Sequence, residues 1–226
     1  MSGTLYIVST PIGNLMDVTQ RAIEILSQVD FVLCEDSRIT HRLFEKYNIS
    51  NKLKVINDTN ENYKKDNIIN CLLEGNDLAL VSDAGTPCIS DPGYRIVNIA
   101  RKKHINVITI PGPSSVIAAI SISGLPTDNF FYQGFLPKKK GRQTKFKELS
   151  RFDCSIILFE SPKRVLRTLN DILHFLGDRT VALCRELTKI YEEVKVDKVS
   201  AILEKKEEVK LKGEYVIIIA KEGYKY

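Results

Sequence analysis

The chain has 226 residues and carries 33 Lys and Arg against 28 Asp and Glu, a net charge of +5 at pH 7. Its hydrophobic fraction of 43% is that of a folded globular protein, which excludes a largely disordered chain. No apolar run approaches the roughly 18 residues of a membrane-spanning helix, and no basic leader precedes the apolar N-terminal segment. We therefore expect neither a membrane association nor a signal peptide.

The expected elements of the first half alternate between short strands and helices. Strands are predicted at 5–8, 31–34, 53–56, 78–81 and 106–110, and helices at 17–29, 41–47, 63–74 and 94–103. Asp17 and Gln20 resemble a capping box at the start of the first helix, and Gly75 has the position of a C-terminal glycine after the third.

The second half repeats this style. Strands are predicted at 130–135, 155–159, 180–184 and 214–220, and helices at 114–123, 145–150, 163–177 and 197–208. Alternating elements at these spacings indicate α/β layers with largely parallel central strands. Turn residues gather around 111–128, and we predict two α/β domains, at 1–112 and 113–226.

The cysteines and histidines of the sequence indicate where the protein is located and whether it binds a metal. The five cysteines are an odd number, form no C-x-x-C motif and lie in apolar segments, which is typical of reduced core residues in a cytoplasmic protein. They are Cys34, Cys71, Cys88, Cys154 and Cys184. Because His41, His104 and His174 are isolated from one another and from these cysteines, we expect no metal site.

Four predicted strands run into loops rich in Gly, Pro and small hydroxyl residues. These loops are STPIGN (9–14), SDAGTPCISDPG (82–93), PGPSS (111–115) and ESPKR (160–164). Ligands of open parallel sheets lie beyond the carboxyl ends of the strands, and Gly and Pro make rigid loops that a ligand can approach closely. The pattern predicts a small molecule held largely by main chain in a cleft between the domains, although ordinary turns are the alternative.

The common nucleotide motifs are absent from the sequence. There is no G-x-G-x-x-G after the first strand, no G-x-x-x-x-G-K-[ST] and no G-x-S-x-G. Pro11 also removes an N–H that a pyrophosphate cradle would use. A dinucleotide or nucleoside triphosphate site is therefore disfavoured.

Residues 137–147, PKKKGRQTKFK, carry six cations and no acid. Such a segment is either a solvated loop or an arm that contacts phosphates, and composition leaves both readings open.

Six longer segments resemble a known family. They are LYIVSTPIGNLMDVTQRAIEIL (5–26), CEDSRIT (34–40), LVSDAGTPCISDPGYRIV (80–97), IPGPSSVIAAISISGLPTDNFFYQGFLPKKKGR (110–142), LFESPKRVLRTL (158–169) and CRELTKIYEEV (184–194). Together they are similar to the ribosomal RNA small-subunit methyltransferase I family of the tetrapyrrole-methylase superfamily. The sequence departs from the family in having Ser37 where Thr is commoner, and many members continue past the segment KGEYVIIIA (212–220) into a small further domain.

The resemblance implies an S-adenosylmethionine-dependent enzyme that methylates the ribose 2′-oxygen of a cytidine in the decoding region of 16S ribosomal RNA. The substrate is the RNA or the small ribosomal subunit. The implied fold is the two-domain α/β methylase, distinct from the common Rossmann methyltransferase, usually homodimeric and with the methyl donor bound between the domains.

The methyl donor is predicted to bind mainly to the SDAGTP loop, and we call its predicted binding site the donor site. Asp83 can accept a hydrogen bond from a hydroxyl or pair with a cation, while Ala84, Gly85 and Thr86 leave room for main-chain contacts. The resemblance extends this site to Ile12, Ser114, Ser115, Phe159, Ala182 and Leu183. Core packing is the alternative for Phe159, and capping of the following helix is the alternative for Asp91.

A ribose hydroxyl needs help to lose its proton, and the candidates are Lys189, Glu186 and Glu160, with Glu35 and Asp36 also considered. Lys189 can act as a base only if its pKa is depressed, and an Arg185–Glu186 ion pair is the structural alternative.

Cations and aromatic residues predict the RNA contacts. The expected phosphate partners are Arg38, Arg42, Lys138, Lys139, Lys140, Arg142, Lys163 and Arg164. Tyr132 and Phe135 either stack on an unpaired base or belong to the core.

Two other functions stay open. One is methylation of carbon in a porphyrin or corrin precursor, and the other is an RNA-binding module without catalytic activity.

Overall fold

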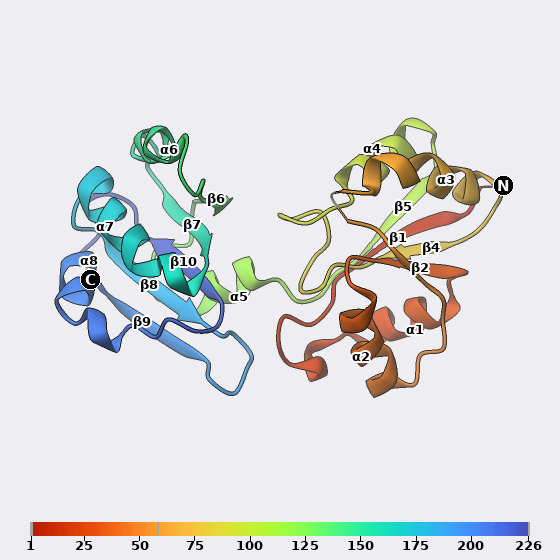
Figure 1. Ribbon diagram of the computed structural model, residues 1–226, viewed down its shortest axis with the longest axis horizontal. Helices are drawn as coiled ribbons and strands as arrows, with labels where there is room; N and C mark the ends of the chain where they lie inside the picture. The colour runs from red at the N-terminus through yellow and green to blue at the C-terminus, as the bar shows by residue number, and fades with distance from the viewer. Residues whose placement is uncertain (1, 58, 226) are drawn as a thin grey trace. The chain divides into compact units, whose positions relative to one another are not determined.

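Figure 1 shows the computed structural model, which describes residues 2–57 and 59–225. The chain forms two compact units, the first ending at Ser114 and the second beginning at Ser115. Each unit contains a five-stranded sheet with helices against its faces. The predicted α/β class is confirmed. None of the helices formed by the described residues combines the length and apolar character needed to cross a membrane.

The sheet of the first unit has the order β3-β2-β4-β1-β5, with all neighbours parallel. The strands are β1 (Thr4–Val8), β2 (Phe31–Cys34), β3 (Leu53–Val55), β4 (Leu78–Leu80) and β5 (Asn106–Ile110). Since parallel strands end at the same edge, the loops that follow β1, β4 and β5 leave the sheet together. This arrangement produces the candidate site described below.

Helices cover both faces of this first sheet (Figure 1). They are α1 (Gln20–Gln28), α2 (Ser37–Tyr47), α3 (Glu61–Leu73) and α4 (Tyr94–Lys102). Alternation along the strands divides the core, because Val8 packs with residues of α1 and α2 while Leu5 packs with residues of α3 and α4.

Two helix starts differ from the prediction. The predicted capping box is wrong, because Asp17 ends a short 3-10 helix, η1 (Leu15–Asp17), and Thr19 caps α1 by accepting a hydrogen bond from the Ala22 N–H. The second helix begins earlier than predicted, at Ser37, because the Asp36 carboxylate caps it through the Arg38 N–H.

The sheet of the second unit has the order β6-β7-β10-β8-β9. The strands are β6 (Phe130–Phe135), β7 (Ser155–Glu160), β8 (Thr180–Arg185), β9 (Glu193–Lys198) and β10 (Tyr215–Ile219). The pair β6–β7 is parallel, whereas β10 runs antiparallel to β7 and β8, and β8 runs antiparallel to β9. Strand β9 was not predicted, because its sequence EVKVDK alternates but offers only two apolar side chains.

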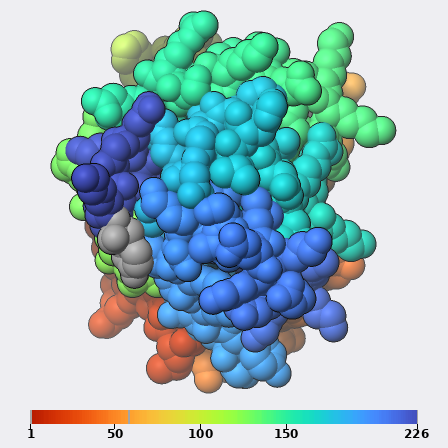
Figure 2. Space-filling view, turned by 90° about the vertical axis from the view of Figure 1, so that its left-hand side faces the viewer, coloured from red at the N-terminus to blue at the C-terminus, as the bar shows by residue number. Residues whose placement is uncertain are grey.

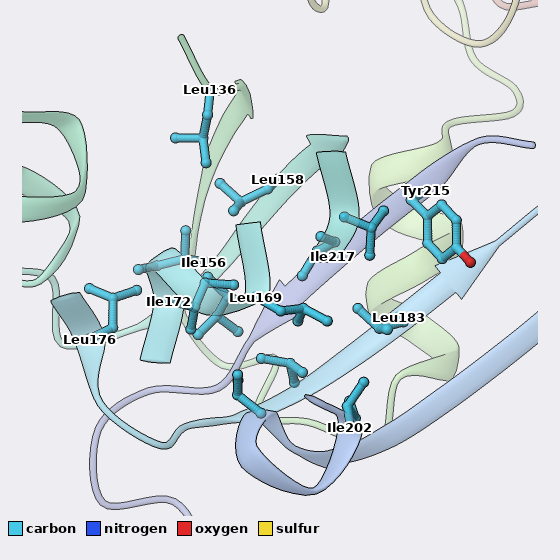
Figure 3. Packing of buried hydrophobic residues seen from close by; sticks show 14 of the residues in the cluster. Leu136, Ile156, Leu158, Leu169, Ile172, Leu176, Leu183, Ile202, Tyr215 and Ile217 are labelled. Atoms are coloured by element: carbon cyan, nitrogen blue, oxygen red, sulfur yellow. The ribbon is translucent and has the colours of Figure 1, made fainter. Parts of the chain in front are cut away.

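Helices complete the second unit. The α-helices are α5 (Ser115–Ile122), α6 (Arg142–Leu149), α7 (Val165–Leu176) and α8 (Val199–Glu204), and the 3-10 helices are η2 (Pro162–Arg164) and η3 (Lys206–Glu208). Leu158, Leu169 and Ile217 belong to the main core, which α6, α7 and α8 cover (Figure 3). The surface formed by the cyan and blue segments that contain α7 and α8 is seen in Figure 2. The prediction of one continuous helix at 197–208 is wrong. Residues 197 and 198 end β9, and the rest of this segment contains α8 and η3.

The cysteines are all free thiols, of which Cys34, Cys154 and Cys184 are buried and Cys71 and Cys88 half-buried.

Candidate functional site

The loops after β1 and β4 are joined by a two-residue bridge. The Thr10 N–H donates to the Gly85 carbonyl at 2.9 Å, and the Gly85 N–H donates to the Thr10 carbonyl at 3.0 Å. The Thr10 hydroxyl donates in addition to the Ser82 carbonyl at 3.0 Å. These bonds fix the SDAGTP loop against the STPIGN loop at the carboxyl edge of the sheet.

The loop after β5 is tied to the same cluster through Thr86. Its hydroxyl lies 2.9 Å from the Ser9 hydroxyl and donates to the Pro113 carbonyl at 3.2 Å. Gly112 passes close to Ser9, since a Cβ at this glycine would lie 3.1 Å from the Ser9 Cβ. Three of the four loops singled out in the sequence thus meet in one place, and the roles of Ser9, Thr10 and Pro113 in joining them were not predicted.

Gly85 shows why this loop needs glycine. Its φ of +83° lies in the left-handed region, and a Cβ there would lie 3.4 Å from Ile12 Cγ2 and 3.8 Å from the Pro113 carbonyl oxygen. Backbone conformation, more than space, therefore requires the glycine. Among the other predicted donor residues, Ile12 is buried, Ala84 is exposed, and Ser114 and Ser115 are half-buried.

Asp83 and Asp36 form a pair of carboxylates with different properties. The Asp36 N–H donates to Asp83 Oδ1 at 2.9 Å, which ties the loop to the start of α2. Burial, with a smaller contribution from the charge of Asp36, raises the pKa of Asp83. Hydrogen bonds from Arg38 lower the pKa of Asp36 to about 2. Asp36 is consequently a carboxylate across the physiological range, while Asp83 takes up a proton more readily than an ordinary aspartate.

Lys189 and Glu186 lie in the second unit, in the loop between β8 and β9. The Lys189 ammonium donates to Glu186 Oε1 and to Glu214 Oε2, each at 3.0 Å. Burial alone would lower the pKa of Lys189, but the hydrogen bonds and charges of Glu214 and Glu186 outweigh it and raise the pKa. A base role for Lys189 requires the opposite shift, so that expectation is corrected: the side chain is an ammonium held by two carboxylates.

Glu186 is a carboxylate for the complementary reason. Burial would raise its pKa, but the hydrogen bonds from Lys189 and from the Glu214 N–H, with the nearby positive charges, lower it. The alternative ion pair between Arg185 and Glu186 does not form, because Arg185 pairs with Glu193 at 3.3 Å.

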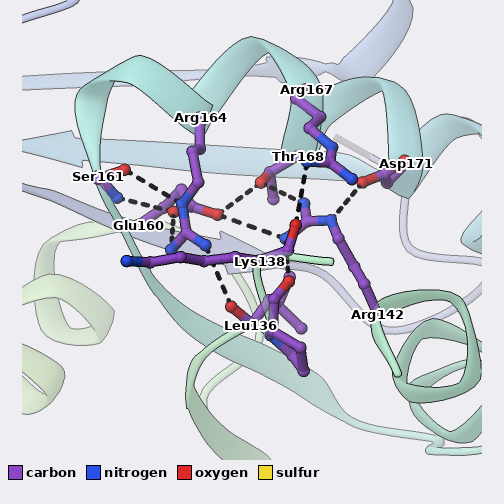
Figure 4. A network of polar contacts seen from close by, with 10 residues as sticks. Leu136, Lys138, Arg142, Glu160, Ser161, Arg164, Arg167, Thr168 and Asp171 are labelled. Carbon is purple, nitrogen blue, oxygen red and sulfur yellow. Dashed lines mark hydrogen bonds and ion pairs between the residues drawn. The ribbon is translucent and has the colours of Figure 1, made fainter. Parts of the chain in front are cut away.

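Glu160 and Arg142 belong to a buried polar network (Figure 4). The Glu160 side chain is 0% exposed and that of Arg142 is 3% exposed, and Arg142 donates to Asp171 Oδ2 at 2.7 Å and to the Thr168 hydroxyl at 2.7 Å. The expectation that Arg142 contacts RNA phosphates is therefore corrected, because its guanidinium has no access to the surface. No sequence pattern indicated the partners Thr168 and Asp171, which come from a different helix.

Most of the other predicted phosphate partners are accessible. Arg38 and Arg42 are exposed on α2 of the first unit, and exposed lysines follow β6 and β7 in the second unit. These lysines are Lys138, Lys139, Lys140 and Lys163. Arg164 is intermediate, with 18% of its side chain exposed and Nη2 2.6 Å from Glu160 Oε1.

Three aromatic rings share one face of the second sheet. The Phe159 ring lies edge-on to Tyr132 and to Phe135, with centroids 5.2 and 5.5 Å apart. A register shift between Tyr132 and Gly134 brings Tyr132 and Phe135 to the same face, and Gly134 has a φ of +71° that suits a bulge. Phe135 is 56% exposed, so a ring of this cluster is accessible to a stacking partner.

The remaining predicted donor residues are less accessible. Ala182 and Leu183 are buried within β8, and Leu183 is part of the main core of the unit. Both side chains lie beneath the surface in this structure. Asp91 does not cap α4, because the N-cap is Gly93. No group of three or more metal-ligating side chains occurs among residues 2–57 and 59–225.

Comparison with known proteins places these features in a family. Residues 4–203 match the family of tetrapyrrole (corrin/porphyrin) methylases. A protein of Escherichia coli O157:H7 named ribosomal RNA small subunit methyltransferase I is 46% identical over 99% of this chain and 79% of its own length. A protein of the same name from Thermotoga maritima is 43% identical over 96% of this chain and 98% of its own length.

Solved structures share the fold at low sequence identity. Diphthine synthase superposes with a TM-score of 0.75 at 14% identity, covering 96% of this chain and 90% of that chain. Uroporphyrin III C-methyltransferase from Thermus thermophilus superposes with a TM-score of 0.66 at 16% identity, covering 96% of this chain and 97% of that chain. The family match and the near-full-length relatives lead to one conclusion: the chain belongs to the tetrapyrrole methylases, within the ribosomal RNA small subunit methyltransferase I family.

Proposed function

We propose that this protein is an S-adenosylmethionine-dependent methyltransferase that acts on ribosomal RNA. More specifically, we propose that it methylates the ribose 2′-oxygen of a cytidine in the decoding region of 16S RNA. The substrate is either the free RNA or the assembled small subunit. The observation that carries the proposal is the 46% and 43% identity, over nearly the whole chain, to proteins named ribosomal RNA small subunit methyltransferase I.

The loop cluster of the first unit fits a methyl donor. Gly85 lies beside Ile12 and Pro113, and its left-handed backbone conformation sets the path of the loop there. Asp83 uses Oδ1 to hold the Asp36 N–H, and Oδ2 makes no hydrogen bond to the described residues, so this oxygen is available to a ligand hydroxyl or amino group. The main chain of Ala84 supplies a further contact in the proposal, whereas the N–H and carbonyl of Gly85 are already bonded to Thr10. Phe159, Ala182 and Leu183 stay predictions.

The chemistry depends first on alignment. When bound, S-adenosylmethionine supplies a methyl group on a positively charged sulfur, which a ribose oxygen attacks in line. The joined loops are rigid because the Thr10–Gly85 bridge and the Thr86–Pro113 hydrogen bond hold them before any ligand arrives. Holding two reactants in such a geometry lowers a barrier by roughly 7–11 kcal/mol, which makes positioning the main contribution of these residues.

Proton removal is assigned to no single residue in this proposal. Lys189 is protonated, so its role in the proposal is to attract a phosphate oxygen. Glu160 makes hydrogen bonds or ion pairs with both of its oxygens and is buried. Burial raises the pKa of Asp83, whereas the pKa values of Asp36 and Glu186 are lowered, so Asp83 accepts a proton more readily than either of these carboxylates.

The exposed lysines after β6 support an RNA substrate. Lys138, Lys139 and Lys140 are exposed and follow Phe135, whose ring is accessible, within five residues of the chain, so this segment offers both phosphate attraction and a surface for base stacking. Replacing these lysines by Gln should reduce the slope of the logarithm of RNA affinity against the logarithm of salt concentration by about 0.7 for each lysine that neutralises a phosphate in the wild type. An unaltered slope would mean that the segment is only a solvated loop.

The direct test is methyl transfer with the purified protein. Small subunits and naked 16S RNA from cells lacking the protein are incubated with isotopically labelled S-adenosylmethionine, and nuclease fragments are examined by mass spectrometry. We expect one labelled 2′-O-methylcytidine in the decoding region. Label on a nucleobase or in another region would refute the finer proposal. Label on carbon of an added tetrapyrrole but not on RNA, or no transfer to either, would refute the RNA methyltransferase itself.

The proposal also includes a cytoplasmic homodimer, as the family resemblance implies. Sedimentation equilibrium of the purified chain measures the assembly state, and a mass of one chain at all concentrations would contradict it.

A further inference from the structure

Three arginines hold consecutive carbonyls at the start of the basic segment. We call residues 136–140, with Lys138, Lys139 and Lys140, the lysine loop. The donor–acceptor pairs are Arg164 with the Leu136 carbonyl at 3.2 Å, Arg142 with the Pro137 carbonyl at 3.3 Å and Arg167 with the Lys138 carbonyl at 3.1 Å. The lysine loop is thus anchored by its backbone, which leaves its lysine side chains exposed.

Glu160 and Thr168 fix the two more buried arginines. Glu160 Oε1 pairs with Arg164 at 2.6 Å, and Oε2 accepts the Thr168 hydroxyl at 2.6 Å and lies 3.9 Å from Arg142 Nη1. The Thr168 hydroxyl in turn accepts a hydrogen bond from Arg142 Nη2 at 2.7 Å. Every member of the network points toward another member or toward the lysine loop (Figure 4).

The cost of burying these charges indicates a role in geometry. A buried ion pair is often no more stabilising than apolar residues of the same volume, because desolvation offsets the attraction between the charges. What apolar residues cannot do is donate directed hydrogen bonds to the carbonyls of an irregular segment. Glu160 and Thr168 supply that direction by orienting Arg142 and Arg164.

We propose that Glu160 and Thr168 are positioning residues for RNA binding, which act by orienting the two arginines that hold the lysine loop. This inference rests on the proposed function, since it assigns the lysine loop to RNA phosphates. Arg142 and Arg164 then contribute to RNA affinity through the loop backbone, without direct contact to phosphate.

A matched pair of substitutions tests the inference. Thr168→Val removes the hydroxyl that joins Glu160 to Arg142 and keeps the side-chain volume. Thr180→Val makes the same change at another buried threonine of the same unit, whose hydroxyl has no hydrogen-bond partner among the described residues. Both variants are compared with the wild type for RNA affinity at several salt concentrations and for amide hydrogen exchange in the lysine loop.

Thr168→Val should speed exchange in the lysine loop and reduce the salt slope of RNA binding by up to about 2, the value for three lysine–phosphate pairs at about 0.7 each. Thr180→Val should leave both measurements unchanged. In a chain already carrying Lys138→Gln, Lys139→Gln and Lys140→Gln, the Thr168→Val change should have no further effect on RNA affinity. That non-additivity is not expected of general destabilisation.

Three results would overturn the inference. If Thr168→Val also lowered RNA affinity in the chain that carries Lys138→Gln, Lys139→Gln and Lys140→Gln, the effect would belong to the stability of the fold. Faster exchange in the lysine loop with unchanged RNA affinity would separate the arginine network from RNA binding and leave the proposed function standing. Absence of RNA binding by the wild type would remove the proposed function, and this inference with it.

Discussion

Asp83 offers the sharpest test of the candidate donor site. One carboxylate oxygen holds the Asp36 N–H at 2.9 Å, and the other makes no hydrogen bond to the described residues. Asp83→Asn keeps an oxygen for the Asp36 N–H but removes the charge that a donor hydroxyl or amino group would meet. A hydrogen bond to a charged group contributes about 1.5–3 kcal/mol, so the Kd for S-adenosylmethionine should rise by about 10- to 150-fold.

Isothermal titration calorimetry with S-adenosylmethionine measures this change directly. Asp91→Asn is the matched control, because it makes the same substitution in the same loop outside the predicted donor contacts, and its affinity should equal that of the wild type. Asp83→Ala should bind no better than Asp83→Asn and should also lose stability, since the Asp36 N–H then has no acceptor. An Asp83→Asn protein that is folded and binds with unchanged affinity would refute the assignment of Asp83 to the site.

The raised pKa of Asp83 adds a pH dependence to the same prediction. Burial disfavours its charged form, so the carboxylate is protonated at a higher pH than an ordinary aspartate. If the carboxylate form binds the donor, affinity is constant above this raised pKa and falls as the pH drops through it. Asp36, with a pKa of about 2, stays charged over that range. The fall should be absent in Asp83→Asn, and an identical fall in both proteins would assign it to another group.

Three further predictions concern stability and reactivity. Gly93→Ala should lower the unfolding free energy by at least about 2 kcal/mol, because φ at Gly93 is +121° and the new Cβ would lie 2.4 Å from Leu80 Cδ2. Gly141→Ala should cost only about 1 kcal/mol of backbone strain, because no atom lies within 4 Å of its new Cβ. Urea unfolding of the two variants measures the difference. Thr180→Val should raise the unfolding free energy by about 1 kcal/mol in the same assay, because it removes a buried hydroxyl that has no partner among the described residues, and a loss of stability would contradict that reasoning. Burial raises the pKa of Cys184 to about 12, so iodoacetamide at pH 8 should leave this thiol unmodified in the folded protein, as peptide mass mapping can check.

The sequence by itself determined the features that depend on local pattern. Alternating apolar runs predicted every strand of the two sheets except β9 and most helices, and Gly85 and Pro113 marked loops whose rigidity follows from backbone chemistry. The motifs in those loops were also long enough to indicate the family. Even the exact start of α1 was beyond such patterns, because Asp17 and Thr19 are both good caps and the preceding 3-10 helix decides between them.

Only the tertiary structure decided the state of the charged residues. Arg142 lies in a strongly basic segment, yet its partners are Asp171 and Thr168, and they remove it from the surface. Lys189 is a candidate base in the sequence, but in the structure Glu214, from a distant part of the chain, accepts its hydrogen bond and raises its pKa. Burial and pairing depend on which distant segments fold together, and a single sequence carries no local record of that pairing. The chemical role of a charged side chain is for this reason a property of the fold, whereas the loop that carries it can be recognised in the sequence.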